Sequence, residues 1–479
     1  MEAKAGNKGF CSSYLLLDPK QATFIDIFYV LFSSNLKNRK FIDCSHEKME
    51  NFWYRLHIFL SILLQKLLLM ISTPMATMGS AVEDMLNLLP SNGGLFGLLL
   101  NILRGKNVMP DREAANYRSF IGYVDTRMKL DRDIKYGDGT YYPALSMMAC
   151  KAAYNNSAYT EAIVNDHWEM DHLGFKDYWN DFLQKAGTQA FLFRDKRDDH
   201  DTIVVCFRGT EPFNANDWCS DVDISWYEFP NIGKIHSGFM KALGMQKTVG
   251  WPEQVVPDQT RGAPLAYYDI RDKLRDLLSK NPEAKFIVTG HSLGGALAIL
   301  FPAILFSHDD KLLLERMEGV YTFGQPRVGD GTFGNYMLKN LNKNGIHYYR
   351  YVYCDDIVPR VPFDNKRFLF KHFGTCVFHN SKYQALIVEE EPYRNYFSIW
   401  AFFPMLKNAI YELIRSFTIV KQRGPDYREG WLLFCIRVVG LVFPGLPAHC
   451  PQDYVNSTRL GSPDKLLFVS QKPVMMSAS

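Results

Sequence analysis

The sequence has few features that would tie the chain to an oxidising compartment. Its nine cysteines are scattered, odd in number and without a CxxC pair, so a disulfide framework is not expected. Its opening residues lack the basic start, compact apolar run and small-residue cleavage site of a signal peptide. We therefore expect reduced thiols in a protein that faces the cytosol. No cluster of metal-ligating residues is visible, and neither a metal nor another cofactor is expected.

Neither positive nor negative charge predominates in the sequence. The formal net charge of the 479 residues is +3, and no long basic run occurs. Nucleic acid is therefore not expected as a partner, because proteins that bind it present a strongly positive surface. Hydrophobic residues make up 47% and charged residues 22%, which excludes wholesale disorder. The length suits one large domain with appendages, or two to three ordinary domains.

The N-terminal part does contain long apolar runs. They cover residues 22–32, 56–79 and 94–103. The second run would extend about 36 Å as a helix, which is enough for the hydrocarbon core of a bilayer. Lys66 lies near its middle, where a charge costs about 3 kcal/mol to insert. We therefore favour a helix that lies on a lipid surface over a plain membrane span or a helix buried in the protein's own core.

The polar residues of the second run are regularly spaced. His57, Ser61 and Gln65 recur at every fourth position, and Lys66 lies beside them. On a helix they form one narrow polar stripe, from which Lys66 can extend toward lipid headgroups. Thr73-Pro74 and Ser91–Gly94 are expected to break the pattern, which predicts a helix–turn–helix or a re-entrant hairpin.

From about Arg118 onward the pattern is that of a globular domain. Two strands, expected over residues 188–195 and 201–209, are joined by a polar, Asp-rich turn as in a hairpin. Further strands alternate with helices, and we expect them at residues 285–290, 317–329 and 346–356. This alternation predicts an α/β fold with a mostly parallel central sheet.

The expected domains are an apolar, helical N-terminal region, 1–115, and a globular domain, 116–479. The globular domain is interrupted at about 383–443 by a strongly apolar and aromatic insert. Two interpretations of the insert stay open: a pair of helices that pack in the core, or a second surface in contact with lipid.

A serine stands between two glycines where an apolar strand pattern turns into an apolar helix pattern. The segment Gly290-His291-Ser292-Leu293-Gly294 fits GxSxG, and its setting is that of a nucleophile elbow. A side chain at either glycine would collide with neighbouring backbone in so tight a turn. The serine would stand at the N-terminus of the helix, whose N–H groups favour an anion. We therefore predict that Ser292 is a nucleophile.

A serine hydroxyl is a weak nucleophile that needs a base, and the base needs an orienting carboxylate. In this type of fold the partners follow in the order Ser, Asp, His. The strand in "YRYVYCDDIVP" ends in Asp355 and Asp356, and either is a candidate carboxylate. His372 and His379 flank an expected strand, whereas His449 lies in a Pro- and Gly-rich loop. A loop can carry an imidazole over the serine, which favours His449.

Two hydrogen-bond donors are expected to hold the oxyanion that forms when the serine attacks a carbonyl group. One is the backbone N–H of Leu293, the residue after the nucleophile. The other must come from another segment of the chain. The strand in "VVCFRGT" ends at Thr210, which has both an N–H and a hydroxyl to offer.

Five motifs occur together in an order that resembles one enzyme family. FRGT, HSGF, GHSLGG, YTFGQPRVGD and DIVPRVP resemble the class 3, fungal-type triacylglycerol lipases. The apolar N-terminal region, the insert and the ending GLPAHCPQDYVNSTRLG are similar to the plant oil-body lipase branch of that family. The resemblance implies an α/β-hydrolase fold.

The resemblance also implies roles for individual residues. It selects Asp356 over Asp355, and it matches His372 to a histidine that the family keeps but does not use as the base. It places a lid at about residues 211–224. The implied assignments are catalysis by Ser292, Asp356 and His449, oxyanion binding by Thr210 and Leu293, and an apolar lid anchor at Trp218.

The implied activity is hydrolysis of the fatty-acyl esters of triacylglycerol, a neutral lipid. The implied location is the cytosolic side of a plant lipid droplet, or oil body, or of the endoplasmic reticulum membrane. The alternatives are a phospholipase A1 or galactolipase of the same fold, a lipase-like scaffold without catalytic activity, and a structural coat protein of lipid droplets.

Overall fold

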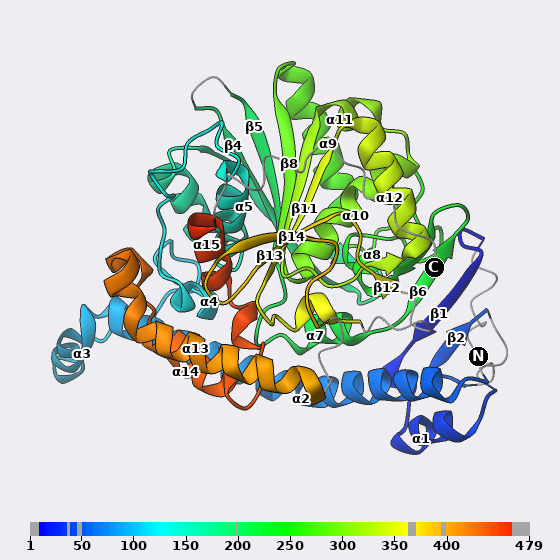
Figure 1. Ribbon diagram of the computed structural model, residues 1–479, viewed down its shortest axis with the longest axis horizontal. Helices are drawn as coiled ribbons and strands as arrows, with labels where there is room; N and C mark the ends of the chain where they lie inside the picture. The colour runs from blue at the N-terminus through cyan, green and yellow to red at the C-terminus, as the bar shows by residue number, and fades with distance from the viewer. Residues whose placement is uncertain are drawn as a thin grey trace.

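A computed structural model describes residues 9–35, 39–45, 50–197, 200–362, 370–393 and 399–461. Its centre is an eight-stranded sheet in the order β14-β13-β11-β9-β8-β5-β4-β3 (Figure 1). These strands are β3 (Asp171–Asn180), β4 (Lys185–Asp195), β5 (Thr202–Phe207), β8 (Lys285–His291), β9 (Met317–Phe323), β11 (His347–Tyr353), β13 (Thr375–His379) and β14 (Ala385–Val388). The five strands from β5 to β13 are parallel, and β3, β4 and β14 are antiparallel additions at the two edges. The expected hairpin of β4 and β5 and the mostly parallel sheet are both confirmed.

Helices cover both faces of this sheet (Figure 1). Along β5, Ile203, Val205 and Phe207 point into one apolar core, and Val204 and Cys206 point into the other. Alternation of this kind buries every side chain of a central strand, which explains its continuous apolar sequence. The first core is closed by α9 (Ala266–Lys280), α10 (Leu293–Ser307) and α12 (Gly331–Asn344), and the second by α5 (Tyr141–Ala152) and α15 (Pro451–Leu460). The result is an α/β-hydrolase fold.

Short helices connect these elements: α4 (Phe120–Val124), α6 (Ser157–Ala162), α8 (Ser237–Ala242) and α11 (Lys311–Arg316).

A second, six-stranded sheet joins the N-terminal region to the rest of the fold. Its order is β12-β10-β7-β6-β1-β2. Ser13 pairs with Glu228 and Leu15 with Trp226, so main-chain pairing crosses the expected domain boundary near residue 115. The strands are β1 (Ser13–Leu17), β2 (Ile42–Cys44), β6 (Trp226–Phe229), β7 (Gly233–His236), β10 (Gly329–Asp330) and β12 (Phe370–Lys371).

The apolar runs form α1 (Phe24–Phe32), α2 (Phe52–Ser91) and α3 (Gly94–Leu103). The expected break at Thr73-Pro74 is wrong, because α2 continues through it, whereas the break expected at Ser91–Gly94 is confirmed, because α2 ends and α3 begins there. Proline removes one backbone hydrogen bond, but packing on both sides of it outweighs this loss. Before it, Ile58 and Ile62 are fully buried, and after it the backbone of Gly79 lies against the ring of Phe213. Among the described helices, only α2 is long and apolar enough to cross a membrane.

The polar stripe of α2 faces the protein rather than solvent. Ser61 and Gln65 are both buried, and Ser61 Oγ donates a hydrogen bond of 2.8 Å to the carbonyl of Val222. Lys66 Nζ donates to the carbonyl of Pro19. The opposite side of the helix exposes a row of apolar side chains: Leu60, Leu64, Leu67, Met70 and Ile71.

The insert forms two helices, α13 (Ile399–Arg423) and α14 (Trp431–Gly440), which Figure 1 shows on the same side of the molecule as α2. Residues 394–398, at the start of the expected first helix, lie outside the described part of the chain. Each helix buries one side and exposes large apolar residues on the other, among them Phe403, Phe417 and Trp431. The two interpretations of the insert are therefore compatible, because one side packs in the core while the other is open.

The two sides of α2 predict different responses to truncation of a side chain. Ile62→Ala should lower the free energy of unfolding by about 2–4 kcal/mol, because Ile62 is fully buried. Leu60→Ala is the matched control two residues away, and it should change that free energy by less than about 0.5 kcal/mol. Urea denaturation of the purified full chain measures both values. Equal losses in the two variants would contradict the packing of α2 against the protein.

Candidate active site

Ser292 sits at the junction of β8 and α10 in a strained backbone conformation. Its φ is 59° and its ψ is −131°, a region that residues with side chains rarely adopt. A Cβ added at Gly290 would collide with the backbone of Gly294, and one added at Gly294 would collide with the carbonyl of Phe207. Both glycines are therefore required sterically, as the motif predicted. The turn holds Ser292 Oγ at the carboxyl end of the parallel strands.

The structure brings Ser292 together with Asp356 and His449. His449 Nε2 lies 2.9 Å from Ser292 Oγ, and His449 Nδ1 lies 2.8 Å from Asp356 Oδ2. Asp356 follows β11 and is fully buried, and His449 ends a short 3-10 turn between α14 and α15. Three segments that are distant in the sequence thus form one continuous chain of hydrogen bonds.

The other candidates from the sequence lie in different surroundings. Asp355 Oδ2 accepts a hydrogen bond of 2.7 Å from the side-chain amide of Asn408 on α13. His372 Nε2 is hydrogen-bonded to the carbonyl of Pro359, and burial keeps the pKa of this imidazole well below its ordinary value. His379 is buried on β13, which also lowers its pKa, to about 4. None of the three has a hydrogen bond to Ser292 among the described contacts.

Two residues that the sequence did not single out support the Ser292–His449–Asp356 chain. Tyr454 Oη donates a hydrogen bond of 2.5 Å to Asp356 Oδ2, the same oxygen that faces His449. His291 stacks on His449 with ring centroids 4.5 Å apart, and its Nε2 lies 3.0 Å from the His449 carbonyl. Since a carbonyl only accepts, Nε2 carries the hydrogen, and the Tyr154 hydroxyl donates to Nδ1. In the sequence, the only signals for these roles were the position of His291 in GHSLG and that of Tyr454 just after the loop of His449.

The two expected oxyanion donors are Leu293 and Thr210. Leu293 is the first residue of α10, and the first N–H groups of a helix have no partner within it. Thr210 follows β5, and Gly209 before it packs against the carbonyl of His291 and the hydroxyl of Tyr154. A side chain at Gly209 would separate the segment of Thr210 from the elbow.

This site belongs to a chain with clear relatives. The model of the family "Lipase (class 3)" matches residues 204–366. The chain is 40% identical to "Triacylglycerol lipase OBL1" of Arabidopsis thaliana, over 96% of this chain and 97% of that protein. The chain belongs to the class 3 lipase family. It is also 41% identical to "Triacylglycerol lipase OBL1" of Nicotiana tabacum, over 85% of this chain and 84% of that protein. A crystal structure of a lipase from Rhizopus microsporus var. chinensis is 26% identical and covers 53% of this chain and 74% of its own, with a TM-score of 0.36.

The lipase holds Thr210 through a carboxyl group that the sequence did not reveal. Thr210 Oγ1 donates a hydrogen bond of 2.7 Å to Asp221 Oδ2. Burial raises the pKa of Asp221 to about 8; the nearby Asp217 adds to this rise, and the bond from Thr210 opposes it. Asp221 is therefore protonated at neutral pH. A protonated carboxyl can itself donate to Thr210 Oγ1, which would free the threonine hydrogen for an oxyanion.

Asp221 lies on α7 (Ala215–Val222), within the segment expected to be the lid. Trp218, the expected lid anchor, is half-buried on this helix, and its Nε1 donates to the carbonyl of Pro212. Ser292 itself is only 4% exposed. Cys219 Sγ lies 3.5 Å from the Gln65 carbonyl, so α2 lies directly against α7.

In the part of the lipase that the structure describes, no three His, Cys, Asp or Glu side chains are placed to hold a metal ion. The site residues are instead a hydroxyl, an imidazole, a buried carboxylate and backbone N–H groups. This set can transfer an acyl group through a serine ester with proton exchange at the imidazole.

Asp221 predicts a dependence of stability on pH. Its pKa is raised from 3.8 to about 8, so its contribution is full below pH 4 and is lost as pH rises toward 8. Asp221→Asn removes this loss. The free energy of unfolding of the variant relative to wild type should therefore increase by about 1.4 kcal/mol per pH unit between pH 5 and 7. Urea titrations at three pH values measure this, and Asp276→Asn, at an exposed carboxylate, is the control that should show no such slope.

Proposed function

We propose that this lipase hydrolyses the fatty-acyl esters of triacylglycerols at the surface of lipid droplets. The observation that carries the proposal is the hydrogen-bonded chain Asp356–His449–Ser292 at a strained elbow. The relatives named triacylglycerol lipase align over nearly the whole chain, which favours a neutral glyceride over a phospholipid or galactolipid as the substrate.

In the proposed mechanism, His449 Nε2 takes the hydroxyl proton of Ser292 as Oγ attacks the ester carbonyl. Asp356 holds Nδ1–H and stabilises the imidazolium, and the N–H of Leu293 and the donors of Thr210 bind the oxyanion. The imidazolium then gives its proton to the departing glyceride oxygen. A water molecule that His449 deprotonates attacks the acyl-serine, releases the fatty acid and restores Ser292.

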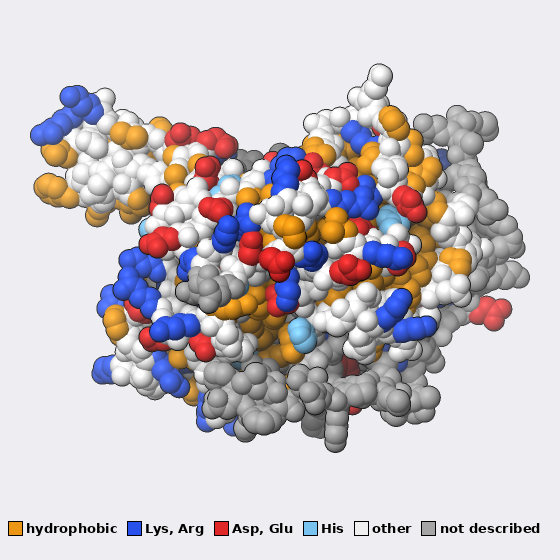
Figure 2. Space-filling view, turned by 90° about the horizontal axis from the view of Figure 1, so that it is seen from above, with side chains coloured by type: hydrophobic (Ala, Val, Ile, Leu, Met, Phe, Trp, Pro, Cys, Tyr) orange, Lys and Arg blue, Asp and Glu red, His pale blue; other side chains and the backbone are white. Residues whose placement is uncertain are grey.

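The distribution of side chains supports attachment to a lipid surface. Large apolar side chains are exposed on α1, α2, α3, α13 and α14. The face turned away from α2 carries Lys, Arg, Asp and Glu side chains of both signs, interspersed (Figure 2). The other side of α2 is already covered by protein, which favours a helix lying in one lipid leaflet over one that crosses the membrane.

Ser292→Ala should reduce release of fatty acid from a triolein emulsion by about 10⁴-fold or more, because the nucleophile is lost. Ser279→Ala, an exposed serine on α9, is the matched control and should keep wild-type activity. Parallel assays on phosphatidylcholine and monogalactosyl diacylglycerol vesicles test the alternative substrates, and faster turnover of either would replace the triacylglycerol assignment. A fluorophosphonate probe that fails to label wild-type Ser292 would instead support the inactive scaffold.

The exposed row on α2 predicts how the protein reaches its substrate. Replacement of Leu60, Leu64 and Leu67 by Ser should reduce flotation with triolein droplets several-fold, because apolar area that would enter the lipid is lost. The control replaces three exposed apolar side chains elsewhere, Leu183, Val255 and Val256, by Ser. Unchanged flotation of the α2 variant would remove α2 from the lipid contact.

A further inference from the structure

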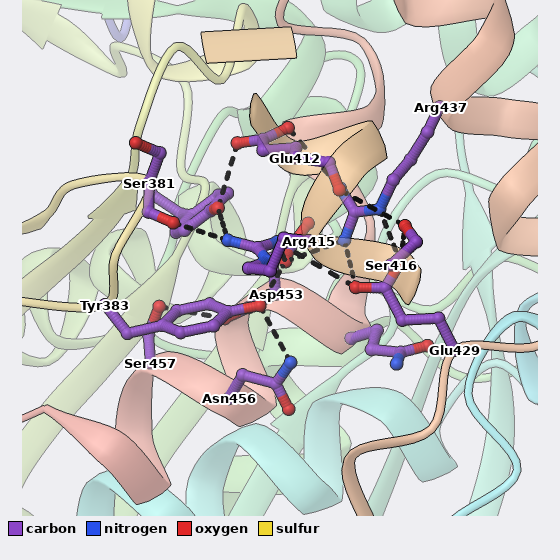
Figure 3. A network of polar contacts seen from close by, with 12 residues as sticks. Ser381, Tyr383, Glu412, Arg415, Ser416, Glu429, Arg437, Asp453, Asn456 and Ser457 are labelled. Atoms are coloured by element: carbon purple, nitrogen blue, oxygen red, sulfur yellow. Dashed lines mark hydrogen bonds and ion pairs between the residues drawn. The ribbon is translucent and has the colours of Figure 1, made fainter. Parts of the chain in front are cut away.

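A buried ionic network connects the insert to the segment that carries His449. We call it the insert network; it consists of Glu412 and Arg415 on α13, Glu429, Arg437 on α14, and Asp453 on α15 (Figure 3). All five side chains are at most 5% exposed. Burying so many charges costs free energy unless each finds its partner, so their arrangement restricts the geometry more than it stabilises the fold.

Two guanidinium groups from the insert converge on the carboxylate of Asp453. Arg415 Nη2 lies 2.8 Å and Arg437 Nη2 lies 3.1 Å from Asp453 Oδ1. Glu429 holds Arg437 by two further bonds of 2.6 and 2.7 Å, which fix the plane of the guanidinium. Burial would raise the pKa of Asp453, but the two guanidinium groups hold it below its ordinary value, so Asp453 is charged.

Asp453 is in the first turn of α15, four residues after His449. The next residue, Tyr454, donates its hydroxyl hydrogen to Asp356. A force that fixes Asp453 therefore fixes both the turn that presents His449 and the hydroxyl that orients Asp356. The His449 imidazole and the Tyr454 hydroxyl both contact Oδ2 of Asp356.

The insert network also contacts the segment that carries the acid. Tyr353 Oη donates to Glu412 Oε1 at 2.9 Å and accepts from Arg415 Nη1 at 2.8 Å. Tyr353 ends β11, three residues before Asp356. Arg415 thus touches groups from both segments, the one that leads to Asp356 and the one that follows His449.

We propose that Arg415 and Arg437 are positioning residues, through which the helical insert holds Asp453 and thereby sets the contact between His449 and Asp356. The proposal rests on the proposed catalytic function of His449 and Asp356. It gives the insert a role in catalysis that is separate from any contact of its exposed side with lipid.

The test uses Arg415→Met in the full-length lipase, with a water-soluble short-chain p-nitrophenyl ester so that lipid binding does not enter the rate. We expect kcat to fall about 10- to 100-fold while KM changes less than twofold, because the imidazole is displaced but the ester-binding groups are not. Arg415→Lys, which keeps the charge, should restore part of kcat.

The pH profile separates positioning from a direct effect of charge. Removal of a nearby positive charge would by itself favour the imidazolium and move the acid limb of the kcat/KM profile to higher pH. A weakened contact with Asp356 disfavours the imidazolium and moves that limb to lower pH. We expect the shift to lower pH, and a shift to higher pH would overturn the proposal.

Arg415→Met leaves Asp453 with one partner fewer and can unfold the protein. The double variant Arg415→Met with Asp453→Asn removes both charges, which restores much of the stability. We expect this folded double variant to remain slow. Wild-type kcat in the double variant would overturn the proposal and reduce the insert network to a structural role.

A matched control breaks a buried ion pair at the edge of the sheet. Asp181→Asn removes the partner of Arg261 beside β3 and should lower stability while kcat stays within twofold of wild type. Failure of the proposed function would look different from failure of this proposal. In that case neither wild type nor any variant would hydrolyse the ester or react with a fluorophosphonate at Ser292.

Discussion

One carboxylate oxygen organises the site: Oδ2 of Asp356 faces both the imidazole of His449 and the hydroxyl of Tyr454. The other oxygen accepts the backbone N–H of Val358 at 2.9 Å, so the buried charge is fully hydrogen-bonded. A carboxylate without these donors would be costly to bury. The fold therefore has to bring the turn of His449, the helix α15 that carries Tyr454 and the segment after β11 to the same point.

Local sequence patterns predicted the parts of the site that are local in the structure. The elbow at Ser292 follows from sterics within five residues, because neither Gly290 nor Gly294 has room for a side chain. The order of strands and helices followed from periodicity, and the parallel sheet from their alternation. The resemblance to class 3 lipases then chose Asp356 over Asp355, which the residues alone had left open, and it agreed with His449, which its loop had already favoured.

Contacts between distant segments were beyond this kind of reasoning. The sequence predicts that the stripe of Ser61 and Gln65 faces a lipid–water boundary, yet both side chains are buried against the segment of Val222. Nothing in the sequence near Asp221 indicates that its carboxyl is buried and bonded to Thr210. Likewise, Arg415 and Arg437 lie in apolar helices, and the sequence alone predicts that charged residues in such helices are exposed. Only the structure shows their buried partners.

The contact between α2 and α7 makes α2 part of the packing of the globular domain. Ser61 donates a hydrogen bond to the end of α7 and Gly79 receives the ring of Phe213, so α2 supports the segment that leads from Thr210 to α7. A chain shortened to its globular part would lose that support. Loss of activity in such a fragment would therefore report the loss of this packing, and a foreign apolar helix in place of α2 would not restore it.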